Sequence, residues 1–235
     1  MTSLLIIIPA YNEEENIRSL IDSIRSISFK IKIEIIVIND CSTDRTSSIC
    51  KELGIKVIDL PCNLGIGGAV QTGYKYAKEN NFDLAIQVDG DGQHDPVYID
   101  KIVEPILEGK ADMVIGSRYI DKSGFQSTRL RRFGIRYLCL LINTLTDLKI
   151  TDPTSGFRVC NKRIIDQFAI NYPKDYPEPE SIMYLRRKGF TIKEEAVVMN
   201  ERVGGTSSIN LNRSIYYMIK VSLAIFFDKI RKESF

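Results

Sequence analysis

Residues 84–96 read LAIQVDGDGQHDP, an apolar run that leads directly into three carboxylates, Asp89, Asp91 and Asp95. Like charges at this spacing repel one another, so a folded chain keeps them at a solvated turn or beside a cation. The run LAIQV has the length and composition of a buried strand. The sequence therefore predicts a strand that ends in an acidic turn.

Strand-like and helix-like segments alternate on both sides of this stretch. Apolar runs occur at residues 4–8, 33–40 and 55–60 before it and at 111–118 after it. The segments between them repeat apolar side chains every three or four positions, as residues 14–27 illustrate. Unalternated apolar strands separated by helices are typical of a mostly parallel sheet with helices on both faces. We therefore expect an α/β fold.

Composition sets further limits. The chain has 235 residues, 44% of them hydrophobic and 26% charged, which suits one large domain or one domain with an appendage. A net charge of only +2 does not favour a nucleic-acid partner. Five cysteines without a CxxC pair, a single histidine and no basic, apolar leader predict buried or half-buried free thiols in a cytoplasmic protein.

Polar residues follow five of the predicted strands. Ligands of open α/β sheets gather at the carboxyl ends of the strands, so these residues predict one crevice for a nucleotide-sized ligand. They are Tyr11 and Glu13, Asp40, Asn63 to Gly68, Asp89 and Asp91, and Ser117 with Arg118.

The glycines and carboxylates narrow the choice of ligand. LGIGGA at residues 64–69 lacks the last glycine of a dinucleotide fingerprint, and no GK[ST] phosphate loop occurs. Asp89 and Asp91 offer hard oxygen ligands for Mg²⁺ or Mn²⁺, with Gln93 as a third. The order Asp95-Pro96 predicts a helix cap rather than a ligand. His94 has two interpretations, support of the metal site or, favoured here, a solvated or capping position.

Six ordered motifs carry a family resemblance. Over residues 3–210 the chain resembles family 2 glycosyltransferases with the GT-A fold, in particular polyprenyl-phosphate sugar transferases. The motifs are IIIPAYNEEENI, VINDCSTDRT, NLGIGGAVQTGYKYA, QVDGDGQHDP, DMVIGSR and DPTSGFRVCNK.

The resemblance implies roles for individual residues. Pro9, Tyr11 and Glu13 would border the base and ribose, Asp40 would contact the base, and Asn63 and Gly67 would line the nucleotide pocket. Asp89 and Asp91, assisted by Gln93, would hold the metal on the diphosphate, and Arg118 would lie near the phosphates or the acceptor. The chain departs from the family at Asn39-Asp40-Cys41-Ser42, where Asp-Asp-Gly-Ser is usual.

The acceptor decides which other residues are needed, and two acceptor classes remain open. A sugar hydroxyl needs a carboxylate base, for which Glu180 or Glu178 of YPEPE is available. A phosphate acceptor is already anionic and needs cations instead. The cations available to it are Arg129, Arg131, Arg132, Arg136 and Arg202, and the candidate catalytic residues are Asp91, Arg118, Glu180 and Arg202.

Two basic, apolar segments, residues 129–145 and 214–232, indicate contact with an anionic membrane surface. Neither is predicted to span a bilayer, and packing against the domain or a partner's helix is the competing explanation. We expect a GT-A domain over residues 1–210 and a C-terminal amphipathic helix over 211–235. We expect the protein to be peripheral at the inner face of the membrane, with or without a membrane partner protein.

The leading hypothesis is an inverting, metal-dependent transferase that moves a sugar from a UDP- or GDP-sugar to a polyprenyl phosphate. Its product would be a lipid-linked sugar for cell-envelope or glycan assembly. The second hypothesis keeps the donor and makes the acceptor a hydroxyl of a growing surface polysaccharide. A non-catalytic nucleotide-sugar binding subunit and a nucleotidyltransferase are the remaining alternatives.

Overall fold

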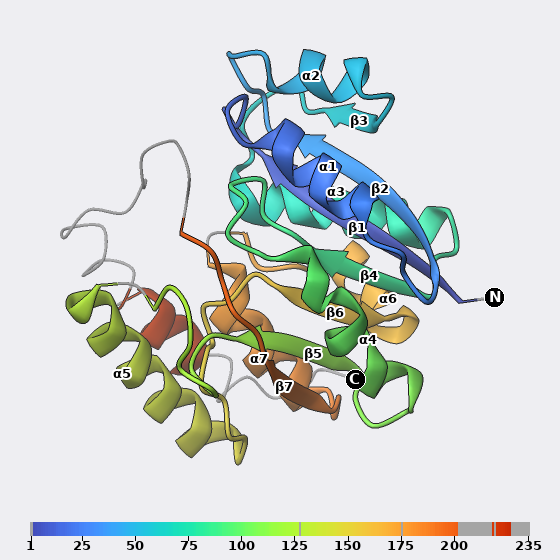
Figure 1. Cartoon of the computed structure of the whole chain (residues 1–235). Helices are drawn as coiled ribbons and strands as arrows, with labels where there is room; N and C mark the ends of the chain where they lie inside the picture. Colours follow the sequence, from blue (N-terminus) through green and yellow to red (C-terminus); the bar gives the residue numbers. More distant parts are fainter. Residues whose placement is uncertain (1, 127, 175, 202–217, 219, 227–235) are drawn as a thin grey trace.

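The computed structural model describes residues 2–126, 128–174, 176–201, 218 and 220–226. Within them a seven-stranded sheet has the order β3-β2-β1-β4-β6-β5-β7, with helices on both faces (Figure 1). The strands are β1 (Ser3–Ala10), β2 (Lys32–Asn39), β3 (Lys56–Asp59), β4 (Leu84–Gln87), β5 (Met113–Ser117), β6 (Arg158–Asn161) and β7 (Ile192–Ala196). The helices are α1 (Ile17–Ser26), α2 (Thr46–Glu52), α3 (Gly65–Glu79), α4 (Ile99–Leu107), α5 (Arg129–Thr146), α6 (Lys162–Ile170) and α7 (Pro177–Arg187), and the short 3₁₀ helix η1 (Pro96–Tyr98) precedes α4.

The expectation of a mostly parallel sheet is confirmed, with two strands, β6 and β7, that the sequence did not reveal. β6 runs antiparallel to both of its neighbours, β4 and β5, and pairs Arg158 with Gln87. Because β6 is antiparallel, the segment that precedes it lies at the carboxyl end of β4. Residues 152–157 therefore meet the acidic turn at Asp89.

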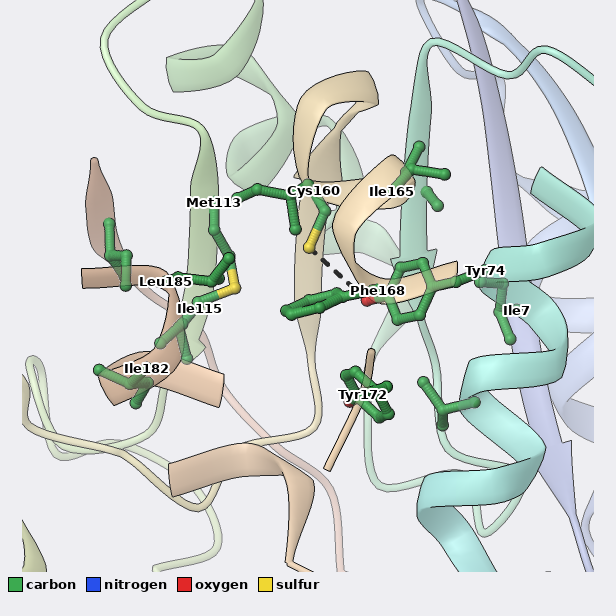
Figure 2. Close-up of a cluster of buried hydrophobic side chains, with 14 of the residues drawn as sticks. Ile7, Tyr74, Met113, Ile115, Cys160, Ile165, Phe168, Tyr172, Ile182 and Leu185 are labelled. Atoms are coloured by element: carbon green, nitrogen blue, oxygen red, sulfur yellow. Dashed lines mark hydrogen bonds between the residues drawn. The ribbon is translucent and has the colours of Figure 1, made fainter. Parts of the chain in front are cut away.

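Two apolar clusters hold the helices against the sheet. Side chains alternate between the faces of a strand, so in β1 Leu5 and Ile7 join one cluster while Leu4, Ile6 and Ile8 join the other. The first cluster includes residues of α3, α5, α6 and α7, and the second includes residues of α1, α2 and α4. In the first, the Tyr74 hydroxyl lies 3.6 Å from the Cys160 sulfur, a hydrogen bond drawn in Figure 2.

The outermost helix, α5, carries the predicted basic, apolar segment. It packs beside the described C-terminal helical residues, where the Tyr137 and Ser222 hydroxyls lie 3.0 Å apart (Figure 1). Among the described residues, no helix combines the length and apolar character that crossing a bilayer requires. The thiol prediction is wrong at one position, because Cys62 is exposed while Cys50 and Cys160 are buried.

Candidate active site

The acidic turn at the end of β4 lies next to β1. After Gln87, the backbone continues to pair with β1, because Val88 N–H donates to Ile7 and Gly90 N–H donates to Pro9. A side chain at Gly90 would bring its Cβ to 3.1 Å from the Pro9 carbonyl oxygen. Glycine thus allows the close approach of the two strands that places Asp89 and Asp91, both half-buried, at the sheet edge.

Side chains from β4 and from the turn after it surround Asp89. Gln87 Nε2 donates to Asp89 Oδ1 at 2.8 Å. His94 accepts from the Asp89 N–H at Nδ1, 3.0 Å away, and is buried against Phe157. The expectation of a solvated or capping His94 is therefore wrong, since the ring packs in the interior beside the first carboxylate.

The rest of the turn is held by local hydrogen bonds. Gln93 N–H donates to Asp91 Oδ1 at 3.1 Å, and the Gln93 carbonyl accepts from Asn200 N–H. Asp95 accepts from Val97 N–H at 3.0 Å and Pro96 opens η1, so the helix cap predicted for Asp95 is confirmed. No three His, Cys, Asp or Glu side chains among the described residues are grouped as a metal cage.

The loop after β1 is joined to the loop after β2 by several hydrogen bonds. Asn12, at φ 54°, accepts from Thr43 N–H at 2.8 Å through its side-chain oxygen. Glu13 N–H donates to Thr46 Oγ1 at 2.8 Å, and the Glu13 side chain is buried. Tyr11 is exposed beside them. The loops that contain the predicted base- and ribose-binding residues thus form one connected rim.

Asp40 has a structural task at this rim. Its carboxylate accepts from the backbone N–H groups of Leu64 and Gly65, at 2.7 and 2.9 Å. A carboxylate at the amino end of a helix satisfies free N–H groups and interacts favourably with the helix dipole. Asp40 therefore holds the start of α3 beside the carboxyl end of β2, and its contact with a base stays a prediction.

Asn63 and Gly67 face different surroundings. Asn63 is exposed, and its side-chain amide donates to the Asp40 carbonyl at 3.3 Å. A Cβ at Gly67 would overlap the backbone carbonyl oxygens of Pro173 and Lys174. The missing side chain at Gly67 thus serves helix packing, and its place in a nucleotide pocket stays a prediction.

Arg118 follows β5 and is buried in an ion pair. Its Nε donates to Asp152 Oδ2 at 2.7 Å and its Nη2 donates to Asp152 Oδ1 at 2.8 Å. Burial opposes the positive charge, but the hydrogen bonds and attraction from Asp152 outweigh it and raise the pKa of Arg118. Glu194 of β7 in turn accepts from Asp152 N–H at 2.8 Å, and burial raises the pKa of Glu194.

The amino end of α7 brings a carboxyl group towards Asp89. Burial raises the pKa of Glu178 to about 7; Arg158 and Arg131 oppose this increase, whereas Asp89 adds to it. Arg158 is buried and donates to the Glu178 carbonyl at 2.6 Å and to Ser181 Oγ at 2.8 Å. This fixes the first turn of α7, which also contains half-buried Glu180.

The predicted acceptor-phosphate arginines are only partly described. Arg131 is exposed and Arg132 half-buried in the first turn of α5. Arg129 begins the same helix, but its side chain lies outside the described part of the structure, and Arg202 lies outside it altogether.

The donor set at the acidic turn fits a hard divalent cation. Asp89 and Asp91 supply carboxylate oxygens, which Mg²⁺ and Mn²⁺ prefer, and Gln93 supplies an amide. Two carboxylates do not complete an octahedral shell, so phosphate oxygens and water would complete it. The arrangement suits a ligand that carries a diphosphate, as the donors of GT-A enzymes do.

Comparison with known proteins agrees with that class. The family model described as Glycosyl transferase family 2 matches residues 5–168. The structure of glucosyl-3-phosphoglycerate synthase from Mycobacterium tuberculosis with Mn²⁺, UDP-glucose and phosphoglyceric acid has a TM-score of 0.75 at 19% identity, covering 99% of this chain and 81% of that one. The match supports the GT-A fold.

Two relatives are named as enzymes of dolichyl phosphate or polyprenol monophosphomannose. The UDP-N-acetylglucosamine–dolichyl-phosphate N-acetylglucosaminyltransferase of Methanococcus voltae is 33% identical over 177 residues, 68% of this chain and 69% of the relative. The polyprenol monophosphomannose synthase of Mycolicibacterium smegmatis is 25% identical over 231 residues, 93% of this chain and 85% of the relative. The chain belongs to glycosyl transferase family 2 and is a glycosyltransferase.

Several residues at the site were not predicted from the sequence. Gln87 lies two positions before Asp89. Residues two apart in a strand share a face, so this spacing could have predicted that Gln87 lies beside Asp89. Asp152, Gly156 and Arg158 belong to DPTSGFRVCNK, a motif to which no role had been assigned. Glu194 had no local signal.

Proposed function

We propose that this glycosyltransferase moves a sugar from a UDP- or GDP-sugar to a polyprenyl phosphate, with inversion at the anomeric carbon. The observation that carries the proposal is that Arg158 links the acidic turn to the first turn of α7: it pairs with Gln87, which holds Asp89, and it donates to the Glu178 carbonyl at 2.6 Å. The names of the relatives from Methanococcus voltae and Mycolicibacterium smegmatis support the lipid-phosphate acceptor.

On the donor side, Asp89, Asp91 and Gln93 would hold Mg²⁺ or Mn²⁺, which when bound neutralises charge on the departing diphosphate. The rim formed by Pro9, Tyr11, Glu13, Asp40, Asn63 and Gly67 would bind the nucleoside. The amino end of α3 borders this region, and a helix amino end favours a negative ligand. Asp40 keeps that helix end in place through Leu64 and Gly65.

On the acceptor side, a phosphate needs cations and no base. Arg131 and Arg132 lie in the first turn of α5, and Arg129 and Arg202 are proposed to join them. Arg118 would contribute its positive charge from the end of β5, where Asp152 holds its guanidinium in a fixed direction. Because Asp152 occupies Nε and Nη2, only the remaining N–H groups of Arg118 would contact phosphate oxygens.

The position of α5 supports attachment to a membrane. Phe133, Tyr137 and Leu140, spaced four and three positions apart, are exposed on one helix face, and Leu223 and Phe226 are exposed on the neighbouring helix. Arg131 and Arg136 are exposed on α5 as well. Apolar side chains bordered by arginines fit an anionic lipid surface. We propose peripheral binding at the cytoplasmic face, with residues 1–210 as catalytic domain and 211–235 as membrane-interface segment.

A hydroxyl acceptor is the second candidate function, and Glu178 favours it. Burial raises the pKa of Glu178 to about 7, which suits a general base near neutral pH. Glu180, in the same helix turn, is the alternative base.

Two experiments test the proposal. Binding of a panel of UDP- and GDP-sugars, with and without Mn²⁺, should show one donor whose binding depends on the metal. Absence of metal-dependent binding would contradict the proposal.

Glu178→Gln and Glu180→Gln should each leave turnover with polyprenyl phosphate within about tenfold of wild type. A loss of about 100-fold or more in either variant, the usual contribution of a general base, would contradict a reaction that needs cations and no base.

A further inference from the structure

We propose that His94 is a positioning residue that, with Gln87 and Gly156, clamps Asp89 in a single orientation for the cation. The inference rests on the proposed role of Asp89 as a metal ligand. It adds a second set of residues, contributed by β4, the turn after it and the segment before β6, whose task is to aim that ligand.

His94 contacts both the backbone and the side chain of Asp89. Its Nδ1 accepts from the Asp89 N–H at 3.0 Å, and its Nε2 lies 3.6 Å from Asp89 Oδ2. A nitrogen that accepts a hydrogen bond carries no proton, so the ring hydrogen is on Nε2 and faces the carboxylate. The backbone bond fixes where Asp89 leaves the strand, and the Nε2–H group attracts Oδ2 to one side.

The ring of His94 cannot turn away. It is 4% exposed and is stacked on Phe157 at a centroid distance of 4.9 Å and an interplanar angle of 14°. The backbone of His94 also bridges to Met199. Packing and hydrogen bonding therefore hold the two ring nitrogens in place, as a ligand-orienting residue requires.

Gln87 and Gly156 close the other sides of the carboxylate. Gln87 is 1% exposed, and its Nε2 donates to Asp89 Oδ1 at 2.8 Å. A Cβ added at Gly156 would lie 2.6 Å from Gln87 Nε2 and 3.0 and 3.2 Å from the two Asp89 carboxylate oxygens. Gln87 and His94 thus contact the two carboxylate oxygens from inside the protein. Only a residue without a side chain fits at position 156.

Such a clamp has a measurable consequence. Each carboxylate oxygen has two lone-pair directions, so one can accept from the protein while the other binds a cation. Groups that orient a ligand in this way typically contribute 10- to 100-fold to metal affinity. The antiparallel course of β6 is what brings Gly156 and Phe157 to the end of β4.

The test is Mn²⁺ affinity, read from the electron paramagnetic resonance signal of free Mn²⁺ in the presence of UDP and, separately, GDP. His94→Phe keeps the stacked ring and loses both polar contacts, whereas His94→Asn returns an oxygen that can accept from the Asp89 N–H. Gly156→Ala intrudes on the carboxylate. Gly134→Ala in α5 is the matched glycine control, and thermal unfolding is measured for every variant.

We expect His94→Phe and Gly156→Ala to weaken Mn²⁺ binding about tenfold or more. His94→Asn should stay within about threefold of wild type and Gly134→Ala within about twofold, with similar unfolding temperatures throughout. If Asp89→Asn abolishes binding while His94→Phe and Gly156→Ala bind like wild type, the clamp is wrong and the proposed function stands. If Asp89→Asn binds like wild type, or wild type binds no Mn²⁺, both are wrong. If His94→Phe does not fold, Gly156→Ala alone decides.

Discussion

Asp152 binds the guanidinium of Arg118 through two parallel hydrogen bonds, Nε to Oδ2 at 2.7 Å and Nη2 to Oδ1 at 2.8 Å, with its own side chain fully buried. The Arg118 backbone N–H also donates to Oδ2, at 3.3 Å. Asp152 is held in turn by Glu194, which accepts from its N–H. A buried charge pair of this kind is costly to break, because the remaining partner keeps its charge away from water.

Removing one partner should therefore destabilise the fold strongly. Asp152→Asn leaves the Arg118 charge without its carboxylate, and we expect a loss of about 3–5 kcal/mol in the free energy of unfolding, measured with urea. The matched control is Glu52→Gln, which breaks the exposed pairs of Glu52 with Arg18 and Arg45. That change should cost less than about 1 kcal/mol. Equal losses in the two variants would contradict the assigned role.

Replacing Cys41 by glycine should stabilise the protein. Its φ of 62° lies in the left-handed region, which costs a residue with a Cβ about 1–2 kcal/mol. The family usually has glycine at this position, so Cys41→Gly should raise the free energy of unfolding by about 1 kcal/mol in urea denaturation, after the greater freedom of glycine in the unfolded chain is subtracted. Asn81, at φ 57°, already tolerates this region, and Asn81→Gly should gain less. A lower stability of Cys41→Gly would refute the explanation.

The pKa of Glu178 makes stability depend on pH. Burial raises this pKa to about 7 in the folded state from the usual 4.5. Between these values the folded protein binds a proton that the unfolded chain releases, so stability from this group falls as pH rises. Below about pH 4.5 both states are protonated and the penalty is absent.

Comparison with Glu178→Gln isolates this effect. The free energy of unfolding of wild type, relative to Glu178→Gln, should fall by roughly 2 kcal/mol between pH 5 and pH 8, because one pKa unit corresponds to about 1.4 kcal/mol and partial exposure reduces the total. Urea denaturation at several pH values measures the difference. Parallel pH profiles for the two proteins would show that Glu178 has an ordinary pKa.

The exposed face of α5 should control membrane binding. Phe133 is 74% and Leu140 66% exposed, so replacing both by Ser should change stability little. Each buried apolar side chain contributes about 1.5–3 kcal/mol, so the double variant should bind anionic vesicles at least about tenfold more weakly in a flotation assay. Ile170→Ser on α6, also 74% exposed, is the matched control and should bind like wild type. Equal weakening in both would contradict the assigned surface.

Local patterns predicted five of the seven strands, most of the helices and the Asp95 cap, because apolar periodicity and an Asp-Pro cap are local properties. They did not predict β6 or β7, since these short strands, RVCN and IKEEA, contain charged residues and no apolar run. The Arg118 pair was missed because Asp152 is 34 residues away and no spacing rule links them. His94 was misplaced because a polar ring in an acidic turn resembles a solvated residue until Phe157 is seen to stack on it.

The most direct measurement is sugar transfer itself. Purified protein, Mn²⁺, labelled UDP- and GDP-sugars and either undecaprenyl or dolichyl phosphate are incubated, with Asp91→Asn and a chelator as controls. The proposed function predicts an organic-extractable, acid-labile labelled lipid that forms only with metal and an intact Asp91. Label that appears only on a saccharide hydroxyl, with none in the lipid phase, would contradict it.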